Sequence, residues 1–408
     1  MNLTASPTEI FNDFHLSFVE NPYYHYQQLP SDPTILIRSP GCWITKNYRV
    51  ISDVLSDKRF QRNFWKNKID QHGDGIKSEP SLTTMSHWIL LVNPPDHTRL
   101  RDLIAPFFSR NQIDKWRSKI KETANRLIDC TLHRGSIDII NDFSLPLTME
   151  FMYQILGIDP EEREEILSKT IPPRRLLDPP TPLSRDELNL ENFNMEQLEK
   201  HVWKIYEERR NNPKEDLISF LSQAHKNDNV LTEKECISQI ILLLFSGIDT
   251  VPHMIGNSIL ALHQHPQQLE LLLSNPAIFP TALHELLRYV PPVHMINMEA
   301  AEDVTIDGQV IKQGNKIILL LAAGNRDPQI FNHPEVLDLS RQKKRLLSFS
   351  AGIHNCLGMH LGMTLFEIGL QTLLERLPIM EIKNINTPEW NLSYSFRGLK
   401  KLTALFAK

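Results

Sequence analysis

A run of apolar residues between positions 236 and 262 limits most strongly what this 408-residue chain can fold into. Its first part, residues 236–248, is too short to cross a bilayer and stops at Asp249. Its apolar positions recur at helical spacing: Ile237, Ile240, Ile241, Leu244, Ile248, Ile255, Ile259 and Leu262. We therefore expect a helix buried in the core of the protein.

The middle of this helix carries residues that a helix interior disfavours. Asp249 and Thr250 compete with the helical hydrogen bonds of the backbone. Pro252 has no N–H, so the carbonyl of Ile248 loses its usual partner. A glycine, an acid, a hydroxyl and an opened carbonyl within one turn can hold water against a bound ligand. The alternative is a simple helix kink in which Asp249 is satisfied by the opposite wall.

Cys356 lies in a loop-like stretch, residues 349–358, which is followed at once by an amphipathic helix pattern. A helix that starts at the sulfur directs its free N–H groups at it and favours thiolate over thiol. Gly352 and Gly358 allow a tight turn and close approach to a flat ligand. The pattern predicts a soft-metal site, and the alternative is a buried structural cysteine at a helix cap.

Two other segments place charged side chains on one helix face. Glu285 and Arg288 are three residues apart, so they can pair. His97 and Arg101 are four residues apart in a helix expected to start at residues 95–96. Taken alone, each pair is equally typical of a solvated helix surface.

Together these segments resemble the cytochromes P450, and they occur in that family's order over most of the chain. In the family, such residues hold haem propionates, deliver protons to dioxygen, lock the scaffold and ligate the haem iron. The resemblance rests on His97 with Arg101, on Asp249 with Thr250, on Glu285 with Arg288 and Arg341, and on the loop around Cys356.

The resemblance implies a mainly α fold with a minor β part, a triangular helical prism with small β-sheets. Residues 1–408 would form a single catalytic domain, with β-rich portions near 33–50 and 293–322 and a helical core over 94–290 and 357–377. From the residues themselves we expect a hairpin over 304–311 with an Asp-Gly turn, and a buried strand over 316–321.

The resemblance also implies haem b as cofactor, O2 as co-substrate, and electrons from NAD(P)H through an external reductase. Cys356 would be the metal ligand. Thr250 would stabilise bound dioxygen and Asp249 would relay protons. The implied cofactor-binding residues are His97, Arg101, Phe349, His354, Cys356 and Gly358.

Two positions depart from the family's pattern. Met298 stands where an arginine usually binds a propionate, and Leu346 stands where a histidine commonly does so. We expect Arg345 to compensate, together with His97 and Arg101.

The substrate pocket is expected from position relative to these motifs. His294 differs in kind from the other wall residues, because its ring could bond a substrate oxygen, although the backbone could satisfy it equally well. The expected walls are Leu243, Ser246, Gly247, Val293, His294, Ile296 and Phe396. Proline-rich residues 171–182 and the polar residues 61–88 would be long loops that form a lid and an entrance wall.

The composition limits which kinds of partner molecule we expect this protein to bind. The net charge of −5 argues against nucleic acid. The first residues lack a signal-peptide pattern, and no membrane anchor is apparent, so we expect a cytoplasmic monomer with reduced thiols. A ferredoxin or flavodoxin-type partner would dock on the Cys356 face, where Lys343 and Lys344 could attract an acidic surface or merely be solvated.

The predicted function is a haem-thiolate monooxygenase that hydroxylates a C–H bond of a hydrophobic small molecule. Terpenoids, fatty acids and other secondary metabolites, free or tethered to a carrier protein, all fit. One alternative is an oxidase that couples, cyclises or desaturates without inserting oxygen. A peroxygenase is disfavoured by Asp249 and Thr250. The last alternative is a haem-free scaffold that recruits carrier-bound substrates.

Overall fold

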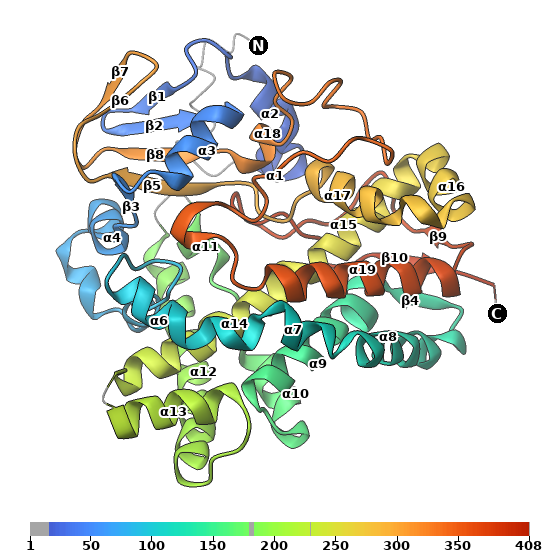
Figure 1. Ribbon diagram of the computed structural model, residues 1–408, viewed down its shortest axis with the longest axis horizontal. Coiled ribbons are helices and arrows are strands. Elements are labelled where there is room, and N and C mark those ends of the chain that lie inside the picture. The colour runs from blue at the N-terminus through green and yellow to red at the C-terminus, as the bar shows by residue number, and fades with distance from the viewer. Residues whose placement is uncertain (1–15, 179–182, 229, 408) are drawn as a thin grey trace.

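The computed structural model describes residues 16–178, 183–228 and 230–407. Most of these residues are helical, and a five-stranded sheet lies to one side of the helices (Figure 1). Its strand order is β1-β2-β8-β5-β3, and only the β2–β8 pair is parallel. The strands are β1 (Leu36–Ser39), β2 (Cys42–Thr45), β3 (Phe60–Gln61), β5 (Ile296–Ala300) and β8 (Lys316–Leu319).

Two smaller sheets complete the β part of the described chain. The first has the order β4-β10-β9, and its strands are β4 (Ser136–Asp138), β9 (Glu381–Ile382) and β10 (Thr403–Leu405). The second is the hairpin of β6 (Val304–Ile306) and β7 (Gln309–Ile311). Asp307 and Gly308 both have positive φ, 45° and 77°, as a two-residue type I′ turn requires. The predicted hairpin is confirmed, and so is the buried strand, which ends two residues earlier than expected.

The helices account for the rest of the architecture. The N-terminal half contains α1 (Leu16–Glu20), α2 (Pro22–Gln28), α3 (Tyr48–Ser56), α4 (Phe64–His72), η2 (Asp74–Ser78), α5 (Pro80–Met85), α6 (Asp96–Ile104), η3 (Ala105–Phe108), α7 (Arg110–Asp114), α8 (Arg117–Leu132), η4 (Ile139–Ser144), α9 (Leu145–Leu156), α10 (Pro160–Lys169), α11 (Arg174–Leu177) and α12 (Arg185–Asn211). The C-terminal half contains α13 (Leu217–Asp228), α14 (Glu233–Asp249), α15 (Val251–Gln264), α16 (Pro266–Ser274), η5 (Pro276–Ile278), α17 (Phe279–Tyr289), α18 (Leu321–Gly324), η6 (Gly352–His354) and α19 (Met359–Arg376).

The long apolar helix is the core element, as predicted. It begins with a capping box, in which the Thr232 hydroxyl accepts the Glu235 N–H and the Glu235 carboxylate accepts the Thr232 N–H. Glu233–Gln264 is long and apolar enough to cross a membrane, but 89% of its most apolar window is buried inside the protein. The helix is interrupted at Thr250, and Pro252 stands in the first turn of α15.

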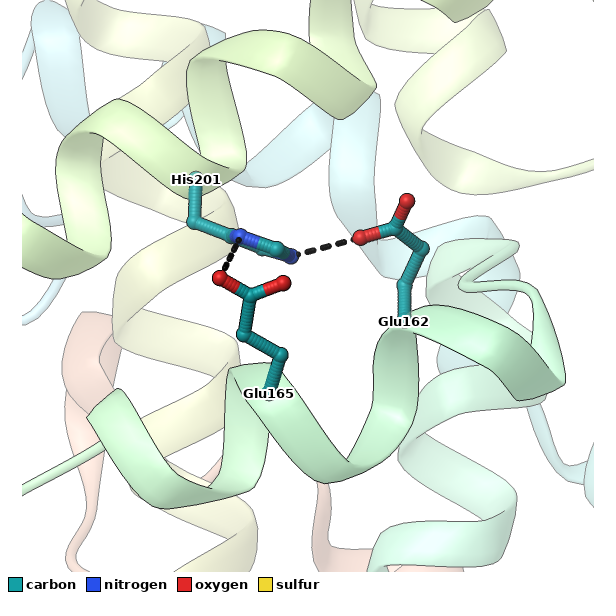
Figure 2. Close-up of side chains that lie close together, drawn as sticks. All are labelled: Glu162, Glu165 and His201. Atoms are coloured by element: carbon teal, nitrogen blue, oxygen red, sulfur yellow. Dashed lines mark ion pairs between the residues drawn. The ribbon is translucent and has the colours of Figure 1, made fainter.

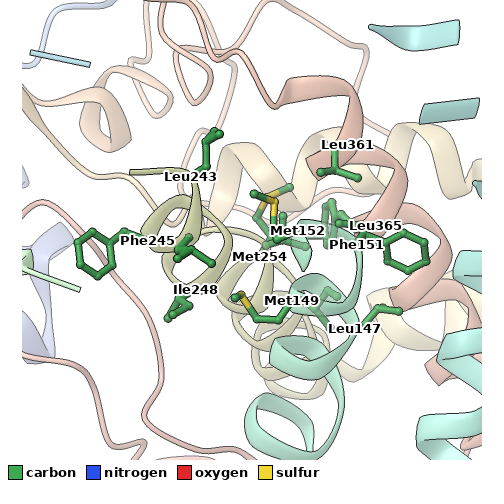
Figure 3. Packing of buried hydrophobic residues seen from close by; sticks show 14 of the residues in the cluster. Leu147, Met149, Phe151, Met152, Leu243, Phe245, Ile248, Met254, Leu361 and Leu365 are labelled. Carbon is green, nitrogen blue, oxygen red and sulfur yellow. The ribbon is translucent and has the colours of Figure 1, made fainter. Parts of the chain in front are cut away.

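Helices α9 and α19 pack beside this interrupted helix (Figure 3). A Cβ on Gly247 would lie 2.7 Å from the Cγ of Met152 on α9, so only glycine allows the helices to come this close. Met149, Met152 and Met254 fill the space between them. The packing presents the residues around the interruption to an internal cavity.

Two segments expected as loops differ from that expectation. Residues 61–88 form α4, η2 and α5, because Asn63 caps α4 and Pro80 starts α5. Within the proline-rich segment, residues 174–177 form the one-turn helix α11, and residues 179–182 lie outside the described part of the chain. The many prolines of this second segment were expected to exclude a helix, but α11 forms in the stretch between them.

Candidate functional site

One cavity of about 330 Å³ gathers residues from segments that are far apart in the sequence. It lies where α6, α14, α11 and the loop before α19 meet, and most of its lining is apolar. Of the predicted site residues, it is lined by His97, Arg101, Leu243, Ser246, Gly247, Asp249, Thr250, Val293, Ile296, Phe349, His354, Cys356, Gly358 and Phe396. His294 and Arg345, predicted for the substrate and the cofactor, do not line it, and neither does the predicted structural triad of Glu285, Arg288 and Arg341.

The Cys356 loop is held in a tight turn. The Cys356 N–H donates to the carbonyl of Phe349 at 2.9 Å. Gly352 has φ +65°, and a Cβ there would lie 2.3 Å from the carbonyl oxygen of Leu55, so no other residue fits without a shift. The loop therefore presents the Cys356 thiol to the cavity just before α19 begins.

The electrostatics of Cys356 differ in part from the sequence prediction. The Gly358 N–H and the Arg101 guanidinium lower the pKa of the Cys356 thiol, as expected at the start of a helix. Burial acts in the opposite direction and is stronger, so the pKa of the thiol is raised. The helix terminus and Arg101 therefore favour the thiolate, as predicted, while the surrounding protein opposes it. A thiol of this kind needs a bound cation to hold it as thiolate.

Polar side chains gather at one edge of the cavity. The rings of His97 and His354 meet edge to face with centroids 4.4 Å apart, and the Nε2 atom of each is buried without a hydrogen-bond partner. Burial lowers the pKa of His354 most, and with the charges of Arg62, His97 and Arg101 it brings that pKa to about 3. Arg101 donates to the side chain of Asn355 at 2.7 Å. This edge therefore presents donors toward the cavity.

Arg345 does not join this edge, which corrects the sequence expectation. Its side chain is exposed, and its carbonyl accepts a hydrogen bond from the Tyr48 hydroxyl at 2.7 Å. The loop before Phe349 runs over the surface and directs Arg345 to solvent. Arg62, which directly follows β3, lines the cavity instead. Sequence analysis missed it because it begins the segment expected to be a loop.

Asp249 and Thr250 lie on the wall formed by the helix interruption. The Thr250 hydroxyl donates to the Ser246 carbonyl at 2.8 Å. The carboxylate of Asp249 is buried and pairs with Arg174 of α11, with Nη2–Oδ1 and Nε–Oδ1 distances of 2.5 and 2.7 Å. Burial raises the pKa of Asp249, and the Arg174 and His253 charges lower it by less. The kink and the satisfied acid proposed as an alternative both occur, on a wall of the cavity.

Arg174 was also missed as a site residue, although it stands in the proline-rich segment expected to be a lid. The one signal in the sequence was that the positive charge of Arg174 could pair with the acid Asp249 on another helix.

His294 faces away from the cavity, contrary to expectation. Its Nδ1 lies 3.1 Å from the Tyr26 hydroxyl, and its ring packs against Tyr23 and Tyr26. Burial lowers the pKa of His294 well below its usual value. Val293 lines the cavity and pairs with Phe396, and in extended backbone the next side chain points to the opposite side.

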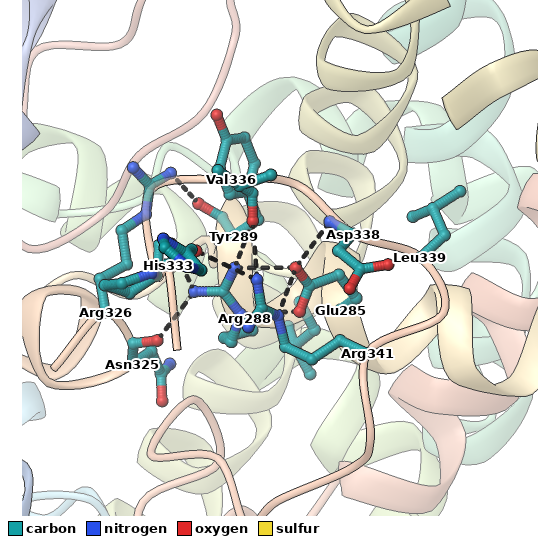
Figure 4. A network of polar contacts seen from close by, with 12 residues as sticks. Glu285, Arg288, Tyr289, Asn325, Arg326, His333, Val336, Asp338, Leu339 and Arg341 are labelled. Atoms are coloured by element: carbon teal, nitrogen blue, oxygen red, sulfur yellow. Dashed lines mark hydrogen bonds and ion pairs between the residues drawn. The ribbon is translucent and has the colours of Figure 1, made fainter. Parts of the chain in front are cut away.

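The Glu285 network lies behind the cavity wall (Figure 4). Arg288 donates to both carboxylate oxygens of Glu285 at 2.7 and 2.8 Å, and Arg341 donates to one of them at 3.0 Å. The same oxygen accepts the backbone N–H of Asp338 at 3.0 Å. The remaining guanidinium donors bond carbonyls of the segment 325–336. This network fixes that segment to α17.

A second ionic cluster ties α10 to α12, away from the cavity (Figure 2). The Nε2 and Nδ1 atoms of His201 lie 2.8 and 3.3 Å from carboxylate oxygens of Glu162 and Glu165. Lys204 and Lys169 pair with the same two carboxylates. These ammonium groups already neutralise the acids, so the cluster is a salt-bridge network joining the two helices.

The donor set of the cavity fits haem. A thiol accessible from the cavity, apolar walls, and guanidinium and imidazole groups without acidic partners suit a flat apolar group that carries a metal and two carboxylates. Cys356 would ligate the metal, and His97, Arg101 and His354 would hold the carboxylates.

Comparisons with known proteins agree with this chemistry. The family model described as cytochrome P450 matches residues 277–390. The biotin biosynthesis cytochrome P450 of Bacillus subtilis is 33% identical, over 95% of this chain and 97% of that protein. Cytochrome P450 CYP107DY1 of Priestia megaterium is 32% identical, over 89% of each.

A solved structure has the same fold. The crystal structure of P450BioI, in complex with an acyl carrier protein ligated to hexadec-9Z-enoic acid, has a TM-score of 0.88. It is 32% identical, and the match covers 96% of this chain and 99% of that chain. The chain therefore belongs to the cytochrome P450 family, whose members are haem-dependent monooxygenases that use O2.

Proposed function

We propose that this enzyme hydroxylates a C–H bond of a hydrophobic small molecule, most specifically a long acyl chain. The observation that supports this best is the cavity itself, in which Cys356 and the Asp249–Thr250 pair line one apolar space. Its other walls are aliphatic and aromatic, so burial of apolar substrate surface would drive binding.

Each side chain then has a defined task. Haem, when bound, supplies the activation of O2 and the oxidising chemistry. Cys356 ligates it, while Leu243, Val293 and Phe396 exclude water and orient the substrate. Asp249 holds a proton more readily than an exposed acid because burial raises its pKa. Thr250 presents its hydroxyl one residue away, and the two residues can pass a proton inward from the Arg174 side.

The substrate class is supported by relatives. The similar P450BioI structure contains a fatty acyl chain on a carrier protein, and a similar Bacillus subtilis protein is named for polyketide biosynthesis. We therefore infer a carrier-tethered or free acyl substrate for this chain. Pro172 and Pro173, just before α11, line the cavity together with residues 88–91, and these two segments would frame its entrance.

Electrons would come from NAD(P)H through a separate reductase and a ferredoxin or flavodoxin-type protein. Lys343, Lys344 and Arg345 are exposed on the loop that leads to Phe349, close in sequence to Cys356. Such a cationic loop would steer an acidic electron donor.

The first test is the spectrum of the purified enzyme reduced under carbon monoxide. The red-shifted band characteristic of thiolate-ligated haem is expected, together with a spin-state change on titration with palmitoleoyl carrier protein or palmitoleic acid. Hydroxylated product carrying label from 18O2 would then establish the reaction. Product without label would instead establish the oxidase alternative, and a protein that takes up no haem would establish the scaffold alternative.

A further inference from the structure

Arg62 is a buried cation for which the described chain provides no acid. Arg62 is 8% exposed, and it takes part in none of the ion pairs among the described residues. Burial lowers its pKa to about 10, and no neighbouring carboxylate offsets this effect. One of its terminal nitrogens donates to the carbonyl of Asn297, while its Nε is buried without a partner. A buried guanidinium of this kind is costly unless an anion joins it.

The backbone around Arg62 is firmly held. Its N–H donates to the Asn93 side chain at 2.9 Å, and Asn93 returns a hydrogen bond to its carbonyl at 2.6 Å. Strand β3 pairs Gln61 with Glu299 of β5, so extending the register by one residue places Arg62 opposite Met298. Met298 packs into an apolar cluster and brings no charge. The guanidinium therefore reaches the cavity from the neighbouring strand.

Other unpartnered atoms lie around the same cavity. Buried atoms without hydrogen-bond partners are the Nε of Arg62, the Nε1 of Trp88, the Nε2 of His97, the Nε2 of His354 and the Oγ of Ser350, and all five residues line the cavity. Among the described lining residues the one acid is Asp249, which Arg174 already neutralises. Arg62 and Arg101 thus leave two positive charges for a ligand to neutralise.

We propose that Arg62 anchors a carboxylate arm of the haem, together with His97, His354 and Arg101. The inference rests on the proposed haem enzyme and adds a residue that the family resemblance did not indicate. A guanidinium can bond a carboxylate through two parallel N–H groups, which matches the free Nε of Arg62. It supplies the charge that Met298 lacks and that Arg345 cannot deliver from the surface.

The test compares haem release from the holoenzyme and from an Arg62→Met variant. Transfer of haem to excess apomyoglobin is expected to be roughly 10- to 100-fold faster for the variant, because a charged hydrogen bond is lost. Arg62→Lys should give an intermediate rate. The matched control is Arg59→Met, an exposed arginine three residues earlier that pairs with Asp57, and its release rate should equal that of the wild type. Equal rates for wild type and Arg62→Met would overturn the proposal.

Haem dimethyl ester separates recognition of the carboxylates from packing. With this esterified haem, wild type and Arg62→Met should release at the same rate, because neither can use the charge. A difference that persists with the ester would mean that Arg62 acts through the fold, and the proposal would be wrong. Thermal unfolding of the two apoproteins provides a further check, since removing an unpaired buried charge should not lower the apoprotein midpoint. A wild type that binds no haem would refute the proposed function itself, which these rates distinguish from failure of the Arg62 assignment.

Discussion

Glu285 and Asp249 are both buried carboxylates paired with arginine, yet their surroundings differ. The Glu285 side chain is 1% exposed and is bonded by two guanidiniums and a backbone N–H. The Asp249 side chain is 7% exposed and has one guanidinium, from a one-turn helix next to the prolines. An acid whose oxygens are bonded by a complete set of donors locks a structure. An acid with one donor on a short segment can exchange protons.

The two arginine environments differ in the same way. Arg288 is 1% exposed, lies on α17 and fixes the carbonyls of the segment 325–336. Arg174 is 21% exposed and stands at the rim of the cavity. The comparison teaches that an Arg–carboxylate pair is structural when both partners lie behind fully bonded surroundings, and suited to proton exchange when it lines the cavity with a single guanidinium donor.

The largest effect should come from breaking the fixed pair. Glu285→Gln leaves two buried guanidiniums short of a charge, and we expect it to lower the free energy of unfolding by about 3–5 kcal/mol. Urea denaturation measures this loss. Glu367→Gln is the control, because Glu367 pairs with Arg117 at a half-exposed site and should cost less than about 1 kcal/mol. Similar losses for both variants would remove the distinction drawn above.

The next effect concerns turnover. Asp249→Asn removes a proton donor and keeps the shape, so we expect turnover to fall by about 10²-fold or more while the protein stays folded. Product formation per haem and the unfolding midpoint, measured on the same samples, separate these effects. Full activity in Asp249→Asn would show that protons enter by another route.

The pH dependence of stability provides a sharper comparison. An acid whose folded pKa is raised binds more protons when folded, so the wild type loses stability as pH rises from about 4 toward that pKa. Relative to Asp249→Asn, the loss can reach about 1.4 kcal/mol per pH unit. Urea denaturation of the wild type and of Asp249→Asn, repeated at a series of rising pH values, measures this loss of stability. If the wild type instead gained stability relative to the variant as pH rose, the Arg174 charge would lower the pKa of Asp249 by more than burial raises it.

The smallest effect is expected at the cluster joining α10 and α12. His201→Gln removes a link between two carboxylates that lysines also neutralise, so the free energy of unfolding should fall by about 1 kcal/mol. Haem content should not change, because the cluster lies outside the cavity lining. A large loss of haem would show that this helix pair controls the cavity.

Much of the site could be predicted because each motif carries local information. The helix interruption at Asp249–Thr250, the tight loop at Cys356 and the spacing of Glu285 and Arg288 follow from residue types and chain geometry. Residues whose role depends on the direction in which the side chain points could not be assigned from the sequence. His294 alternates away from its cavity-lining neighbour, and Arg345 runs to solvent.

The two arginines that complete the cavity were visible only after folding. Arg62 directly follows the short strand β3 and Arg174 begins the one-turn helix α11, and neither element is long enough to show a period in the sequence. The sequence alone therefore determined the family, the buried helix and the cysteine loop, because these depend on local spacing. Tertiary structure decided which cations face the cavity and in which direction the pKa of Asp249 moves, because burial and pairing arise only when distant segments meet.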